Sequence, residues 1–161
     1  MKIFLLIIIV VILLYGYRVY ASKPQLETEG GFVTTKDIPL LVKTLQKEGN
    51  EGAFWVILIP GTSKSDDYDA NLQFSVDKNA VGMDWVLIAE RNKLDKEIFV
   101  KVVESHNLTV KKLSGNGVEY LRVEGSENFP MLAEEVLREL YGINSDIEMP
   151  LIITGLDWKK S

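Results

Sequence analysis

The sequence predicts an α+β fold, a two-layer sandwich in which helices cover one face of a mainly antiparallel sheet. Three observations support this prediction. Some segments place apolar residues along one side of a helix, other segments show the alternation or the apolar runs of strands, and hairpin-length connections join most of the strands. The expected order is α-β-β-β-α-β-β-α in a single domain, residues 35–161, which follows an N-terminal hydrophobic helix and a linker at residues 22–34.

One helix and three strands are expected in the first half of the domain. The helix should begin after a capping pattern at residues 34–37 and end at Gly49. The run 54–60 is apolar on both faces, which is typical of a central strand. Alternating residues at 71–76 and an apolar segment at 81–89 predict the next two strands.

The second half predicts a helix, a hairpin and a final helix. An apolar stripe indicates a helix that begins at Asn92 or Asp95. Strands at 108–113 and 118–124 are joined by an Asn-Gly turn, because this dipeptide tolerates the positive φ angles of a tight hairpin. The last helix should begin at Asn128 and end at a glycine.

The tail at residues 150–158 is apolar and allows three interpretations. It could add an edge strand, dock on the core, or bind a partner. If it binds a partner, the contact residues are expected to be Leu151, Ile153 and Trp158.

Residues 1–21 are the most apolar part of the chain and predict a signal peptide or a membrane anchor. The apolar run from Ile3 to Tyr15 has the length of a secretory hydrophobic region, and residues 19–21 suit cleavage. A cluster of tyrosines and Arg18 instead suit a retained anchor. The residues expected to contact the bilayer are Ile3, Leu5, Ile8, Val11, Leu14, Tyr15 and Tyr17.

The location follows from the same segment. The domain is expected to be membrane-anchored or exported, in the cell envelope or outside the cell. The basic residues on the two sides of the run nearly balance, which leaves the cytosolic face open. The chain has no cysteine, which excludes a lipoprotein, disulfides and cysteine-based metal sites.

The domain is acidic. Setting aside Lys2 and Arg18 leaves 16 of the 18 lysines and arginines against 23 acids, a net charge of −7 for residues 22–161. An acidic domain without a basic stripe does not match the electrostatics of nucleic-acid binding. We therefore expect no nucleic-acid partner, and no motif indicates a cofactor.

A family resemblance adds to this description. The predicted order of elements and the stretch GVEYLRVEGSENFPMLAEEVLRELYGI at residues 117–143 resemble the bacterial type III secretion chaperone-like superfamily. The resemblance implies a small acidic α/β domain, often dimeric, that binds other polypeptides without performing chemistry.

Few residues indicate chemistry. Residues 67–71 match the opening of a calcium loop, but Leu72 and Lys78 occupy positions that need Gly and Glu. His106 is the only histidine and falls at the expected end of the second helix, where a cation complements the helix dipole. We therefore expect neither catalytic nor metal-binding residues.

These observations favour a non-enzymatic, chaperone-like protein-binding module with a polypeptide partner or a second copy of itself, tethered to or exported across a membrane. The alternative is a small hydrolase or metal-dependent enzyme that uses His106 with Asp66, Asp67 or Asp69. A purely structural envelope protein is a third interpretation. A His106 that reaches a carboxylate inside a cleft would favour the enzyme.

Overall fold

The computed structural model describes residues 30–61, 68–115 and 117–158. It confirms an α+β fold, with a seven-stranded sheet and four α-helices in these residues. The strands are β1 (Phe32–Val33), β2 (Phe54–Pro60), β3 (Tyr68–Asp77), β4 (Ala80–Val86), β5 (Val110–Gly115), β6 (Val118–Glu124) and β7 (Met149–Thr154). The helices are α2 (Ile38–Glu48), α3 (Glu90–Leu94), α4 (Lys96–Ser105) and α5 (Phe129–Tyr141), and the 3-10 turn η1 (Thr35–Asp37) precedes α2.

The strand order across the sheet is β1-β7-β2-β3-β4-β6-β5, and every neighbouring pair is antiparallel. The C-terminal tail therefore enters the sheet as β7, between β1 and β2. The predicted linker was too long at its C-terminal end, since Phe32 and Val33 pair with Pro150 and Met149. β7 and β1 therefore extend the sheet beyond β2. The predicted order of elements included neither of these two strands.

The second predicted helix is two helices. Asn92 does not cap a helix but lies buried within α3, whereas Asp95 is the N-cap of α4. The third strand also ends at Val86, earlier than expected, because the chain turns there into α3. Apolar periodicity marks the stripe of a helix more clearly than its ends.

Other local expectations are confirmed. The β3–β4 hairpin turns through Lys78 and Asn79, with φ angles of 52° and 63°. The Asn128 side chain accepts a hydrogen bond from the backbone N–H of Met131 at the start of α5, and Gly142 closes that helix with a φ of 65°.

The expectation of a signal peptide or transmembrane helix needs correction. Within residues 30–61, 68–115 and 117–158, no helix is long and apolar enough to cross a membrane. Residues 1–21, including the seven expected to contact a bilayer, lie outside the described residues. The envelope or extracellular location that rests on them stays a prediction.

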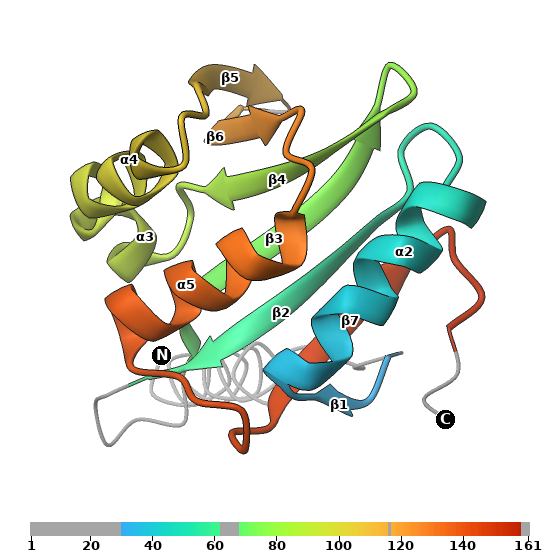
Figure 1. Cartoon of the computed structure of the whole chain (residues 1–161), viewed down its shortest axis with the longest axis horizontal. Coiled ribbons are helices and arrows are strands. Elements are labelled where there is room, and N and C mark those ends of the chain that lie inside the picture. The colour runs from blue at the N-terminus through green and yellow to red at the C-terminus, as the bar shows by residue number, and fades with distance from the viewer. Residues whose placement is uncertain (1–29, 62–67, 116, 159–161) are drawn as a thin grey trace, which may run out of the picture.

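The fold has two layers. In Figure 1 the helices α2, α4 and α5 lie in front of the sheet, and α5 contacts both of the others. Between the layers, Trp55 stacks on Phe74 and Trp85 stacks on Phe99, each pair with ring centroids 4.5 Å apart. We call the opposite side of the sheet the rear face, because alternate strand residues point there, away from the helices.

Candidate functional site

The rear face changes from apolar to charged along one row of residues. The register places Ile152 of β7 beside Val56 of β2, and Val56 beside Gln73 of β3. The row continues through Asp84 of β4 to Arg122 of β6. Asp84 and Arg122 are each only 1% exposed. A buried ion pair thus lies in the middle of a sheet face, where burial of charge requires full pairing.

The Arg122 guanidinium is fully hydrogen-bonded within three strands. Its Nη1 donates to Asp84 Oδ1 and to Ser75 Oγ, each at 2.8 Å. Nη2 donates to the backbone oxygens of Ala80 at 2.9 Å and Ser75 at 3.5 Å, and Nε donates to Glu124 Oε1 at 2.7 Å. The Ser75 hydroxyl in turn donates to Asp84 Oδ2. All five guanidinium donors therefore have acceptors inside the protein.

The absence of a side chain at position 82 makes room for Arg122. A Cβ added to Gly82 would lie 2.4 Å from Cζ of Arg122 and 2.7 Å from its Nε and Nη2. The guanidinium therefore packs directly over the β4 backbone. This close approach lets it reach the carbonyl oxygens of Ser75 in β3 and Ala80 at the start of β4.

The environment acts differently on the two members of this pair. Burial raises the pKa of Asp84 above its ordinary value, although the Ser75 hydrogen bond and the Arg122 charge oppose the shift. Burial would lower the pKa of Arg122, but the carboxylates of Asp84 and Glu124 outweigh it and raise that pKa. An always-protonated guanidinium whose donors are all used holds strands together and has no donor left for a ligand.

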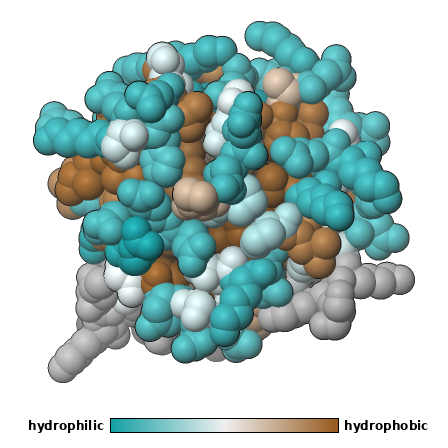
Figure 2. All heavy atoms as spheres, in the orientation of Figure 1, coloured by the Kyte–Doolittle hydropathy of each residue, from teal (hydrophilic) through white to brown (hydrophobic). Residues whose placement is uncertain are grey.

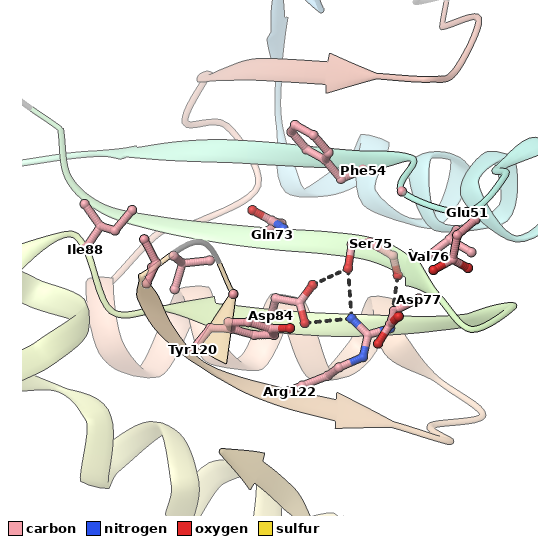
Figure 3. A pocket seen from close by; sticks show the side chains of 14 residues that line it. Glu51, Phe54, Gln73, Ser75, Val76, Asp77, Asp84, Ile88, Tyr120 and Arg122 are labelled. Atoms are coloured by element: carbon pink, nitrogen blue, oxygen red, sulfur yellow. Dashed lines mark hydrogen bonds and ion pairs between the residues drawn. The ribbon is translucent and has the colours of Figure 1, made fainter. Parts of the chain in front are cut away.

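A pocket of about 490 Å³ lies over this network on the rear face. Figure 3 shows Ile88 and Tyr120 toward one end and Glu51 and Asp77 toward the other, with Gln73 between them. Phe54, Val86 and Val118 add further apolar lining. The pocket therefore has an apolar end, a polar centre and an acidic end.

Two polar groups of the pocket, Gln73 at its centre and Tyr120 toward its apolar end, are free to bind a ligand. Within the described residues, the Gln73 amide and the Tyr120 hydroxyl make no hydrogen bond, and neither side chain is fully buried. Burial, then the nearby Asp84 charge, raises the pKa of Tyr120, so its hydroxyl keeps its proton at neutral pH. Gln73 offers both donors and an acceptor.

His106 lies elsewhere, on the helical side. It caps the C-terminus of α4, as expected, and its Nε2 is 2.8 Å from Oε2 of Glu135 on α5. It also lines a depression of about 340 Å³ with Leu108 and residues 125–128. Asp66 and Asp67 lie outside the described residues, as does the side chain of Asp69. Among the described residues, no group of three or more histidine, aspartate or glutamate side chains could hold a metal ion.

The predicted partner-binding residues of the tail lie in the hydrophobic core or pack against it. Leu151 is fully buried and Ile153 is 7% exposed, both in the core beneath the helices. Trp158 packs against that core, and its indole N–H is buried without a hydrogen-bond partner in the described residues. Leu151 and Ile153 therefore contribute to the core and are not presented to a partner, whereas Trp158 follows β7 and is partly exposed.

On the helical side, the large hydrophobic side chains exposed among the described residues come from different helices. Figure 2 shows hydrophilic residues spread over this face with hydrophobic ones between them. The large hydrophobic side chains exposed on the helices are distributed over all four of them: Leu40, Leu94, Ile98 and Met131. Exposed apolar residues scattered singly are normal on a soluble surface.

Sequence reasoning missed the rear-face site. Part of its signal was present, since Asp84 interrupts the otherwise apolar strand β4 with a charge, whereas Arg122 is one of three charged residues in β6. The charge in β4 predicts a buried pair only if the strand that carries its partner is a neighbour, and β4 and β6 are separated in the chain by two helices and a strand.

No family model, no curated protein and no solved structure matches this chain. The resemblance to the type III secretion chaperone-like superfamily therefore stays a prediction.

Proposed function

We propose that this protein is a non-enzymatic polypeptide-binding module whose rear-face pocket contacts the partner. The proposal rests on a difference between two sets of polar groups in the pocket. The charged groups beneath it are satisfied by one another, whereas Gln73 and Tyr120 remain free beside exposed apolar side chains. Free amide and hydroxyl groups next to apolar surface suit recognition of another polypeptide.

The chemistry of the pocket argues against catalysis. Ser75 is its only described hydroxyl besides that of Tyr120, and its proton is held by Asp84 while its oxygen accepts from Arg122. A nucleophile needs a base that can take up its proton. Asp84 is committed to a permanently charged guanidinium, so it is a poor candidate for that role.

The resemblance to secretion chaperones points in the same direction, because members of that superfamily bind polypeptides. A homodimer formed through the same face is the other form of this proposal. The acidic net charge of the domain keeps it soluble, and it suits a partner with positive charge.

Capture from a native extract with the full chain tests the proposal. Ile88 lines the pocket and is 62% exposed, and Leu94 on α3 is 68% exposed. We expect the wild type and Leu94→Asp to recover one stoichiometric partner that Ile88→Asp loses. Both substitutions add one charge at an exposed apolar site, so Leu94→Asp is the matched control.

Equal recovery of the partner by both variants would show that the pocket does not contact the partner. Recovery of no partner by any of them, together with a monomer by light scattering, would contradict both forms of the proposal.

A small hydrolase that uses His106 is the second candidate. The observation in its favour is the hydrogen bond between His106 and Glu135 at the side of a depression that Ser126 also lines. A histidine oriented by a carboxylate is one part of a general-base arrangement. Hydrolysis of activated esters by the wild type that His106→Ala abolishes would support it, whereas equal rates would eliminate it.

A further inference from the structure

The two ends of the rear-face pocket differ in charge, and this difference specifies a class of partner. Resting on the proposed function, we infer that the pocket takes an extended polypeptide segment that is basic and apolar. A lysine or arginine side chain lies at the Glu51–Asp77 end, and an apolar side chain lies at the Ile88–Tyr120 end.

The acidic end carries two carboxylates that no ion pair neutralises within the described residues, although the charge of Lys78 acts on Glu51. Glu51 and Asp77 both line the pocket, and neither forms an ion pair within the described residues. The Glu51 carboxylate accepts a hydrogen bond from the backbone N–H of Asn79 at 3.3 Å. The N–H groups of Lys78 and Asn79 hold the pKa of Glu51 below its ordinary value, so it is ionised at neutral pH.

Acidic side chains elsewhere on the sheet, unlike Glu51 and Asp77, form ion pairs with cations of the protein. Glu124 is paired with Arg122 and Lys111, and Glu119 is paired with Lys112, all on the β5–β6 side of the sheet. The carboxylates of Glu51 and Asp77, at the β3–β4 end of the pocket, form no ion pair of this kind in the described residues. A cation supplied by the partner would complete that pairing.

The apolar end offers contact area. Ile88 is mostly exposed, and Val118 and Tyr120, at the same end, are partly exposed. Burial of an exposed aliphatic side chain against a partner contributes roughly 25 cal/mol per Å² of apolar surface removed from water. An apolar partner side chain is therefore favoured at this end, where no uncompensated charge needs to be buried.

The centre suits an extended backbone. Gln73 lies between the two ends, and its amide can donate to and accept from a peptide group. In an extended chain, alternate side chains point to the same side and lie roughly 6.6 Å apart. A segment with a basic residue followed at alternate positions by apolar residues can therefore reach both ends while its backbone crosses Gln73.

Three peptides test the inference, because they vary the charged side chain and the apolar side chains separately. The probes are an acetylated, amidated peptide Lys-Thr-Val-Thr-Leu, the same peptide with glutamate for lysine, and the same peptide with serine for valine and leucine. Binding to the full chain is followed by backbone amide NMR shifts at low ionic strength. We expect shifts at Phe54, Gln73 and Tyr120, with affinity about tenfold lower for each altered peptide.

Two double variants, each of which removes two negative charges, test which carboxylates discriminate between the lysine and glutamate peptides. Glu51→Gln with Asp77→Asn should remove the discrimination between the lysine and glutamate peptides. Glu97→Gln with Glu134→Gln removes two charges from exposed positions on α4 and α5 and should leave the discrimination unchanged.

The outcomes separate this inference from the proposed function. Equal rear-face shifts with all three peptides would overturn the inference and leave a polypeptide-binding face. Rear-face shifts that depend on protein concentration instead of peptide would assign the face to a second copy and also overturn it. No rear-face shift with any peptide, together with no captured partner, would overturn both.

Discussion

Arg122 and Asp84 form an ion pair across β6 and β4, with Nη1 of the arginine 2.8 Å from Oδ1 of the aspartate and both residues 1% exposed. Removal of one partner from a buried pair leaves an uncompensated charge, which costs about 3–5 kcal/mol. We therefore expect Arg122→Met to lower the free energy of unfolding by about that amount, measured by urea denaturation.

The double substitution Arg122→Met with Asp84→Leu is the control. Because it removes both charges, it should recover most of the loss. A double variant as unstable as Arg122→Met alone would show that the loss comes from packing or from Ser75 and Glu124, and not from an orphaned carboxylate.

Gly82 is expected to tolerate no side chain while Arg122 is present. Its Cβ would lie 2.4 Å from Cζ of Arg122, and the guanidinium is tied to three strands and cannot move aside cheaply. We expect Gly82→Ala to destabilise the protein by about 1–3 kcal/mol. The measurement is the shift in the urea midpoint at constant m-value.

The same substitution made in Arg122→Met should cost much less, because the shorter side chain frees the space over β4. Gly115→Ala is a second control, since its nearest neighbour would be 3.8 Å away. Equal costs for Gly82→Ala in the two backgrounds would mean that the backbone, and not Arg122, requires glycine.

Asn92 joins β3, β4 and α5 from a fully buried position. Its Nδ2 donates to the backbone oxygens of Asn71 and Val86 at 2.9 Å, and its Oδ1 accepts from the Tyr141 hydroxyl at 3.2 Å. Because buried groups would lose their partners, we expect Asn92→Ala to cost at least ~2 kcal/mol of unfolding free energy. Asn50→Ala, at an exposed site, should change it by less than ~0.5 kcal/mol.

The stability of the β5–β6 edge should depend on pH through Glu124. Hydrogen bonds from Lys111 and then Arg122 hold the pKa of Glu124 below its ordinary value of 4.5. A carboxylate whose pKa is lowered by folding stabilises the protein above its unfolded pKa, and this contribution is lost as the pH falls through the folded pKa.

The wild type should therefore exceed Glu124→Gln in stability at pH 7, and the difference should shrink as the pH falls below 4.5. Asp84 contributes with the opposite sign, because burial raises its pKa, and the comparison at each pH cancels that contribution. Thermal unfolding from pH 3 to pH 7 measures the difference in stability between the wild type and Glu124→Gln. A constant difference over this range would mean that Glu124 is not held in its charged form.

Much of the fold could be predicted because it is encoded locally. The stripes of α2, α4 and α5 and the apolar run of β2 lie within short windows of sequence, as do the caps at Asn128 and Gly142. The short α3 and the two-residue β1 were missed, because elements of that length carry too few residues to show a period.

The candidate site could be predicted only in part. The position of His106 at a helix end followed from its own segment, but its partner Glu135 lies 29 residues away. Likewise, Asp84 and Arg122 are 38 residues apart, and Ser75 is 47 residues from Arg122. Contacts of this kind depend on strand order and register, which local patterns do not specify.

By itself, the sequence determined the fold class, the acidic character of the domain and the absence of cysteine chemistry, because composition and periodicity are properties of the chain. Only the tertiary structure decided that the tail becomes β7, that Leu151 and Ile153 belong to the core, and that Arg122 lies over Gly82. These outcomes required non-neighbouring strands to be brought together in one register, and only in that register does a buried charge meet its partner.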